Sequence, residues 1–209
     1  MIEITHTMLD DLRTAVSATM SPKRFRHTAA VEEMTERLCM LYCPSLVMPM
    51  RAAALLHDCT KELTPEAQED LCRVLGLEVT ALDHISPKTL HARTAAALIP
   101  VQYSAFDRPL IKDAVRWHTT GHAGMTLTER ILYLADYIDA SRTFESCVTL
   151  RRYFWDAKPE QMNEKERLVH LFNTLLLSFD MTMRDLLEEN RPIAPDTVDA
   201  RNELLLALG

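Results

Sequence analysis

Four histidines and two aspartates occur at positions where apolar helices would be expected to bury hydrocarbon. The clearest case is the doublet His57-Asp58, which ends the apolar stretch of residues 46–56. Imidazole and carboxylate are ligands for Fe, Mn, Zn, Co or Ni, whereas structural zinc sites are rich in cysteine. The polar residues that share this apolar setting are His27, His57, Asp58, His91, His118 and Asp136.

A single histidine on an apolar face is more often a hydrogen-bonded core residue than a metal ligand. Six such groups together are a different case, because burying polar and charged side chains without partners carries a large free-energy cost. Metal ions at a shared centre would satisfy all six groups. Six ligands exceed what one open catalytic metal normally uses, so the number favours two metal ions.

The elements that must position these groups are helices. Apolar residues recur every three or four positions, and in the row His27, Val31, Met34 and Leu38 the histidine shares the apolar face. We therefore predict an all-α protein formed by one domain over residues 1–209, with a core at about 20–190 and a helical extension at 191–209. The predicted helices lie near 3–19, 22–43, 46–59, 65–75, 87–98, 108–119, 127–141, 143–155, 160–190 and 196–208.

Capping residues and prolines give these boundaries. A hydroxyl followed by proline predicts a helix start, and threonine followed three residues later by glutamate predicts a capping box. The starts predicted in this way are Ser21-Pro22, Thr64-Pro65, Ser86-Pro87 and Thr126 with Glu129. Gly76 and Gly121 predict helix stops, and Pro100 is expected to end the helix before it.

Composition narrows the function classes. The chain has 209 residues with 23 basic and 30 acidic side chains, so its net charge is −7. This balance disfavours a broad nucleic-acid-binding surface, and an anionic substrate would need a local cluster of cations. No apolar segment approaches bilayer length and the start lacks signal-peptide features, so we expect a cytoplasmic protein without a membrane partner.

Four strings carry a resemblance to a known family: KRFRH at 23–27, ALLHDCTKEL at 54–63, LHA at 90–92 and WHTTGHAGMTLTERILYLADYIDASR at 117–142. Their order of His, His-Asp, His, His and Asp resembles the HD-domain metal-dependent phosphohydrolase superfamily. Within it, the strings and the chain length resemble the YqeK-type symmetrical dinucleoside tetraphosphate hydrolases. The last string is the most specific of the four.

The resemblance implies a helical bundle with a metal site among its central helices, holding two metal ions. The metal that the resemblance implies is iron, as two divalent or mixed-valence ions, with Mn or Co as alternatives. One ion would be held by His27, His57, Asp58 and Asp136, and the other by His91 and His118, with Asp58 as the bridge. The implied reaction is symmetrical cleavage of diadenosine tetraphosphate to two ADP by a metal-bound hydroxide.

Substrate-binding residues are predicted beside these ligands. Arg24, Lys61 and Arg142 match family positions, and Asp58, Lys61 and Arg142 are the residues to which we assign catalytic roles. The turn Thr119, Thr120 and Gly121 is small enough to approach a phosphate, although a simple helix stop explains Gly121 almost as well. For His122, contact with substrate and exposure to solvent are equally supported. The histidines outside the pattern are His6, His84 and His170.

Other functions remain open at this point. An HD-domain nucleotidase or phosphodiesterase acting on another nucleotide, such as a guanosine alarmone, would use the same site. A di-iron oxygenase would need a redox-active metal, and a non-catalytic nucleotide sensor would keep the pocket without turnover. The apolar segment LVHLFNTLLLSF at 168–179 predicts a core helix or the face of a homodimer.

Overall fold

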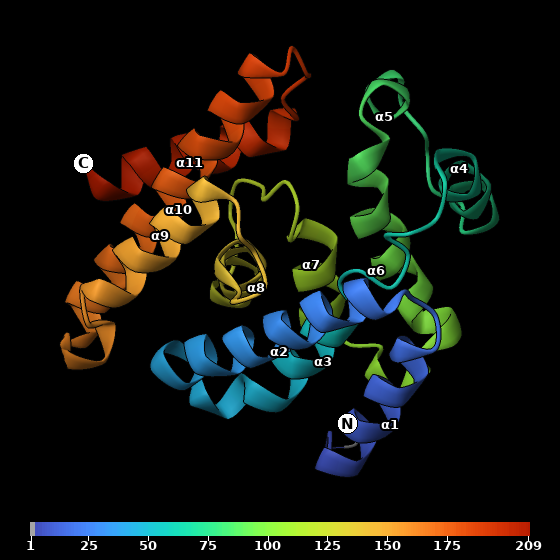
Figure 1. Ribbon diagram of the computed structural model, residues 1–209, viewed down its shortest axis with the longest axis horizontal. Helices are drawn as coiled ribbons and strands as arrows, with labels where there is room; N and C mark the ends of the chain where they lie inside the picture. Colours follow the sequence, from blue (N-terminus) through green and yellow to red (C-terminus); the bar gives the residue numbers. More distant parts are fainter. Residues whose placement is uncertain (1–2) are drawn as a thin grey trace.

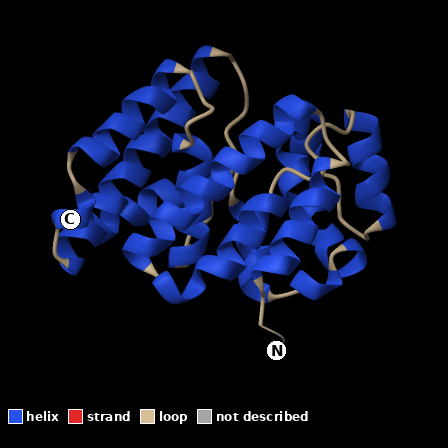
Figure 2. Ribbon diagram, turned by 60° about the horizontal axis from the view of Figure 1, so that its bottom comes forward, coloured by secondary structure: helices blue, strands red, loops and turns tan. Residues whose placement is uncertain are grey.

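The computed structural model describes residues 3–209, and all regular structure there is helical (Figures 1 and 2). The predicted all-α class is confirmed. Four short 3₁₀ turns supplement the α-helices. The α-helices are α1 (His6–Ser17), α2 (Pro22–Tyr42), α3 (Val47–Leu56), α4 (Pro65–Val74), α5 (Ala81–Ile85), α6 (Leu90–Gln102), α7 (Pro109–Trp117), α8 (Leu127–Ile138), α9 (Glu145–Asp156), α10 (Glu164–Glu188) and α11 (Pro195–Leu208).

Most predicted helix starts are formed by the residues that predicted them. The side chains of Ser21 and Thr64 accept hydrogen bonds from backbone N–H groups at the starts of α2 and α4. Thr126 and Glu129 form a reciprocal capping box at the start of α8. These caps satisfy N–H groups that have no partner inside the helix. Gly76 follows the end of α4 with a φ of 68°, a conformation that favours glycine.

Three boundary predictions were wrong. The Ser86-Pro87 pair begins only a 3₁₀ turn, the Ser86 side chain makes no cap hydrogen bond, and α6 begins at Leu90. Pro100 lies inside α6, which continues to Gln102; so close to the helix end, its missing N–H removes a single backbone bond. The helix predicted to end at residue 59 ends at Leu56, because the following residues form tight turns such as Lys61 N to Asp58 O at 3.0 Å.

Two groups of helices meet around α7 and α8, which lie near the centre of Figure 1. Helix α2 packs against α3 and α8, and α7 packs against α3, α6 and α8. The second half of helix α3 is fully buried from Ala52 to Leu56, and its three alanines have no exposed surface. Small side chains let neighbouring helices approach closely, so this apolar segment places the His57-Asp58 doublet at the centre of the bundle.

Helices α9, α10 and α11 form a layer on one side of α8 (Figure 1). Leu171, Leu175 and Phe179 of α10 are fully buried, which confirms that residues 168–179 contribute to the core. The Thr197 hydroxyl of α11 donates a hydrogen bond to the Thr120 carbonyl at 2.9 Å, so this layer reaches the turn after α7. None of the helices within residues 3–209 combines the length and apolar character needed to cross a membrane.

Candidate metal centre

Five helices bring the six predicted ligands together. His27 lies within α2 and His91 is the second residue of α6, whereas His57, Asp58, His118 and Asp136 lie at or just beyond the last turns of α3, α7 and α8. The carboxyl end of a helix carries partial negative charge from its unpaired carbonyl groups. Three such ends converging on one point favour a cation there.

The first half of the cluster surrounds one oxygen of each aspartate. His27 Nε2 lies 3.0 Å from Asp136 Oδ1 and 3.7 Å from Asp58 Oδ2, while His57 Nε2 lies 3.4 Å from Asp58 Oδ2 and 3.8 Å from Asp136 Oδ1. Two nitrogens and two oxygens therefore face a common point, and His27, His57 and Asp136 satisfy the geometry of a metal-binding group. We refer to these four residues as the first half-site.

The second half of the cluster lies on the other side of Asp58. Its other oxygen, Oδ1, is 3.2 Å from His91 Nε2 and 3.8 Å from His118 Nε2, and these two nitrogens are 3.0 Å apart. We refer to His91, His118 and Asp58 Oδ1 as the second half-site. Because the two carboxylate oxygens of Asp58 face different half-sites, this residue has the position of a bridging ligand.

Hydrogen bonds define the tautomers of the histidines. The Nδ1 atoms of His57, His91 and His118 lie 2.6, 2.6 and 2.7 Å from the carbonyl oxygens of Ala54, Lys88 and Val115. A carbonyl oxygen can only accept, so each Nδ1 carries a proton, and the neutral form of each ring presents an unprotonated Nε2 to the centre. Such a hydrogen bond on the far nitrogen is the usual support of a metal-bound imidazole.

Hydrogen bonds account for only part of the burial of these nitrogens. His27 Nε2 and His57 Nε2 are buried without a hydrogen bond to any described residue. His91 Nε2 and His118 Nε2 face each other with lone pairs, and bonding between them would require a second proton on one ring. Burial lowers the pKa of both His91 and His118, the latter well below its usual range, which opposes that proton. The donor set therefore fits two metal cations.

An arginine side chain lies against each of the two carboxylates of the cluster. Arg24 Nη1 lies 2.7 Å from Asp58 Oδ2, and Arg142 Nη2 lies 2.6 Å from Asp136 Oδ1. Burial alone would raise the pKa of Asp136, but Arg142 and His27 together hold it well below its usual range. Burial likewise favours the neutral form of Asp58, yet His57 and His91 keep its pKa low. Both aspartates are therefore ionised and available as ligands.

The Lys61 ammonium lies beside the ligands of the second half-site rather than those of the first. Its Nζ lies 3.1 Å from His91 Nε2, and burial lowers the pKa of this ammonium while Asp58 and Asp136 act in the opposite direction. The Thr119 hydroxyl lies 3.1 Å from His118 Nε2 and 3.2 Å from His91 Nε2. A cation and a hydroxyl thus stand beside the two imidazoles, and their contact with substrate stays a prediction.

Sequence reasoning missed the support of His27. Asp139 is fully buried; its Oδ2 lies 3.4 Å from His27 Nδ1, and the Ser141 hydroxyl lies 3.2 Å from the same nitrogen. Although burial alone lowers the pKa of His27, Asp136 and Asp139 on opposite sides raise it to about 9. The signal was present in the string ADYIDASR, where Asp139 follows Asp136 by one helical turn.

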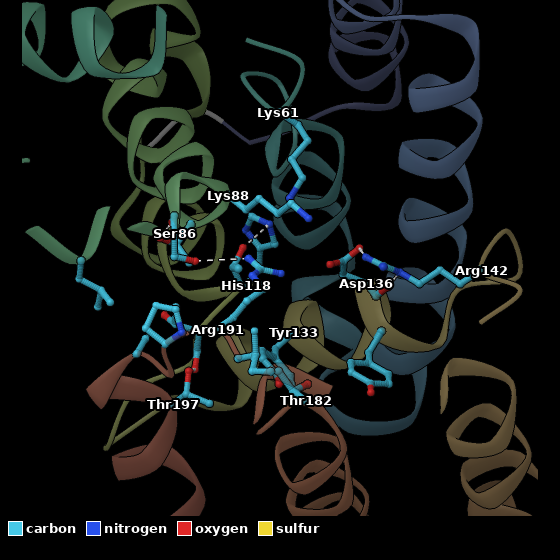
Figure 3. Close-up of a pocket in the computed structure, with 18 residues that line it drawn as sticks. Lys61, Ser86, Lys88, His118, Tyr133, Asp136, Arg142, Thr182, Arg191 and Thr197 are labelled. Carbon is cyan, nitrogen blue, oxygen red and sulfur yellow. Dashed lines mark hydrogen bonds and ion pairs between the residues drawn. The ribbon is translucent and has the colours of Figure 1, made fainter. Parts of the chain in front are cut away.

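A cavity of about 270 Å³ opens beside the cluster (Figure 3). Lys61, His118, Thr119, Asp136 and Arg142 line the side next to the predicted ligands. Other lining residues come from α5 and the 3₁₀ turn before α6, from α8 and α10, and from α11 and the segment before it. These residues are Leu82, Ser86, Lys88, Thr89, Tyr133, Tyr137, Thr182, Leu186, Arg191, Pro192, Ala194 and Thr197.

Gly121 and His122, both predicted to lie near substrate, contact other parts of the protein. A side chain at Gly121, where φ is 63°, would meet Phe179 of α10 at 2.7 Å, so this glycine is needed for the turn and for close packing. His122 Nε2 lies 3.1 Å from Glu129 Oε1, and its ring packs on Trp117. Thr120 lines the cavity, whereas Gly121 and His122 do not border it.

The three other histidines lie outside the cluster. His6 is exposed at the start of α1. His84 is exposed and pairs with Glu69 at 2.9 Å. His170 is buried, stacks on Phe154 and lies with its Nε2 3.0 Å from the Phe154 carbonyl oxygen.

The sequence of this chain matches one protein family and is similar to named enzymes over most of its length. Residues 24–141, the segment that carries all six predicted ligands, match the HD domain family. The chain is 31% identical over 153 residues to a symmetrical bis(5'-nucleosyl)-tetraphosphatase of Bacillus subtilis, covering 73% of this chain and 74% of that protein. It is 30% identical over 187 residues to the protein of the same name in Halalkalibacterium halodurans, covering 90% and 91%.

A crystal structure shows the same fold over nearly the whole chain. It is described as a predicted HD superfamily hydrolase involved in NAD metabolism, from Clostridium acetobutylicum, with a TM-score of 0.81 and 29% identity. The match covers 95% of this chain and 97% of that one. The protein belongs to the HD domain family and, within it, to the family of the symmetrical bis(5'-nucleosyl)-tetraphosphatases. The resemblance found in the sequence is thereby confirmed.

Proposed function

We propose that this protein hydrolyses dinucleoside tetraphosphates symmetrically, with diadenosine tetraphosphate as the favoured substrate and two ADP as products. The observation that carries the proposal is the pair of half-sites that share Asp58, next to a cavity bordered by Lys61 and Arg142. The names of the relatives that align over most of the chain support the same reaction and substrate.

The ligands proposed for the first cation are His27, His57, Asp58 and Asp136, and those for the second are His91, His118 and Asp58. We propose iron as the native metal, with Mn and Co as working substitutes, because the mixed imidazole and carboxylate donors suit all three. Bound at these positions, the cations would make a water more acidic, polarise phosphoryl oxygens and neutralise charge on the leaving phosphate.

The chain's own cations and hydroxyl would orient the substrate. Lys61 and Arg142 border both the cluster and the cavity, so they can bind phosphate oxygens beside the central P–O–P bridge. Arg24, which pairs with Asp58, supplies a third positive charge, and Thr119 a donor. When water adds to a central phosphorus, the bond to the bridging oxygen breaks, and each half leaves as a nucleoside diphosphate.

Metal analysis of the purified protein, combined with chromatography of its products, tests this proposal. We expect diadenosine tetraphosphate to give ADP as the sole nucleotide product, and the Asp58→Ala variant to give none. AMP and ATP as products would refute symmetrical cleavage. Preference for a guanosine alarmone would instead support the related nucleotidase or phosphodiesterase.

Exchange of the metal separates the remaining functions. A hydrolase should keep turnover when iron is replaced by Mn or Co, whereas a di-iron oxygenase requires a redox-active metal. A nucleotide sensor would bind substrate without forming product in any metal. If Mn or Co restored hydrolysis of diadenosine tetraphosphate in the metal-depleted protein, both the oxygenase and the nucleotide sensor would be excluded.

Self-association and a cytoplasmic location stay predictions. We propose that a homodimer would use the outer face of residues 168–179 in α10, because Leu168 and Val169 are 41% and 43% exposed there. Adjacent exposed apolar side chains often mark interaction surfaces. Light scattering after size-exclusion chromatography tests this; a mass near the 23.9 kDa of one chain would contradict it.

A further inference from the structure

The connection between α10 and α11 forms a wall of the cavity outside the segment that matches the HD domain family. The family match ends at residue 141, whereas Arg191, Pro192, Ala194 and Thr197 also line the cavity. The HD segment carries all the predicted metal ligands. Residues of this connection can therefore contact substrate in the cavity without being part of the segment that holds the metal ligands.

The backbone at Arg191 is held by the end of α10. Asn190 has a φ of 52°, in the left-handed region, and the Arg191 N–H donates to the Leu186 carbonyl at 2.8 Å. This arrangement terminates the helix, and Pro192 cannot continue it. Arg191 is thus fixed at the edge of the cavity by the local sequence.

The Arg191 side chain reaches across the chain to the turn before α6. Its Nη2 lies 3.4 Å from the Ser86 hydroxyl, a residue 105 positions away, and its Nη1 lies 3.2 Å from Glu189 Oε2. In Figure 3 it lies beside Ser86, on the opposite side of the view from Arg142. The guanidinium therefore enters the cavity from the side away from the first half-site.

The partners of Arg191 bind it weakly. The contact with Ser86 is long and involves a neutral hydroxyl, and Glu189 is 60% exposed, so water screens that ion pair. By contrast, Lys61 and Arg142 contact residues of the cluster itself at 3.1 and 2.6 Å. Of Lys61, Arg142 and Arg191, Arg191 is the one that a phosphate can engage without displacing a contact to a predicted metal ligand; the other lining cation, Lys88, lacks the planar fork of arginine.

A tetraphosphate chain carries several negative charges, which extend beyond the central bond. We propose that Arg191 binds the polyphosphate chain away from the metal centre and so favours dinucleoside polyphosphates over small phosphate esters. The proposal rests on the proposed function. Arginine suits this role because its planar fork donates to two phosphate oxygens at once.

Steady-state kinetics with two substrates tests the role. In Arg191→Ala, we expect kcat/KM for diadenosine tetraphosphate to fall roughly ten- to a hundredfold, mainly through KM, while metal content is kept. The loss on bis(p-nitrophenyl) phosphate, which has a single phosphate, should be clearly smaller. Arg191→Lys, which keeps the charge without the fork, should recover part of the loss. Arg184→Ala removes an exposed arginine from α10 and serves as the matched control.

The outcomes separate this inference from the proposed function. If the parent protein does not cleave diadenosine tetraphosphate, the proposed function fails. If the parent is active and Arg191→Ala behaves like Arg184→Ala, the inference is wrong. Equal losses on both substrates, or an equal loss in Ser86→Ala, would show that Arg191 only supports the wall. Arg191→Gln repeats the test with a side chain close in size, should the alanine variant fold poorly.

Discussion

The two half-sites of the candidate metal centre share Asp58 but differ in charge. The first half-site has an oxygen from each of two carboxylates, Asp58 and Asp136, besides two imidazoles. The second has two neutral imidazoles and only the other oxygen of Asp58, and the Lys61 ammonium lies beside it. A divalent cation should therefore bind more tightly to the first half-site than to the second.

The ligands of the first half-site are also contacted by more supporting side chains than those of the second. In the first half-site, Asp139 and Ser141 contact the outer nitrogen of His27, and Arg142 binds Asp136. In the second, the outer nitrogens of both imidazoles lie against carbonyl groups of their own helical turns, and no carboxylate within residues 3–209 supports them there. We infer that the first half-site is built to retain a metal more firmly than the second, while both border the cavity, through Asp136 and His118.

The largest effect should come from removing the residue that the half-sites share. Asp58→Ala should lose both metals and all measurable turnover, because each half-site loses a carboxylate oxygen. The fold should persist, since the apolar packing of α3 is unchanged. Metal analysis, circular dichroism and product chromatography measure the three properties. Undiminished metal content in the folded variant would refute the bridging assignment.

The next prediction contrasts the halves directly. His118→Ala should retain about one cation per chain in the first half-site, while turnover falls by more than roughly a hundredfold. Asp136→Ala should retain less metal than His118→Ala, because the cation loses a charged ligand rather than a neutral one. Metal content after desalting decides the order. The reverse order would show that the second half-site is the tighter one.

Much of this centre could be predicted from sequence because it depends on helix faces. The spacing in the row from His27 to Leu38 placed that histidine on an apolar face, and the same reasoning placed Asp136. The tight turns after Leu56 let His57 and Asp58 diverge, and this was expected for adjacent residues near a helix end.

The remaining contacts depend on which helices meet, and local periodicity carries no such information. Asp139 and His27 lie 112 positions apart, and Arg191 and Ser86 lie 105 apart. The close contact between Gly121 and Phe179 of α10 likewise joins residues far apart in the sequence. The continuation of α6 through Pro100 shows that a proline near a helix end need not terminate it.

A smaller effect is expected for the cations that border the two halves. Lys61→Ala and Arg142→Ala should each lower kcat/KM for diadenosine tetraphosphate by roughly ten- to a thousandfold, because each loses a charge-assisted contact to phosphate. Metal content should be kept in both. Lost metal in Arg142→Ala would show that this residue mainly supports Asp136. Full activity in both variants would remove them from the substrate site.

The smallest effect should come from the histidines outside both half-sites, and these variants control for histidine content alone. His84 is exposed and pairs only with Glu69 among its described neighbours, so His84→Ala should leave stability, metal content and turnover within about twofold of the parent. His170 is buried against Phe154, so His170→Ala should lower the free energy of unfolding by about 1–3 kcal/mol while turnover stays within a few-fold. Thermal unfolding, metal analysis and kinetics on the same preparations separate stability from function. If His84→Ala lost metal as His118→Ala is expected to, the assignment of ligands from helix faces would be wrong, because an exposed side chain on α5 cannot reach the shared Asp58.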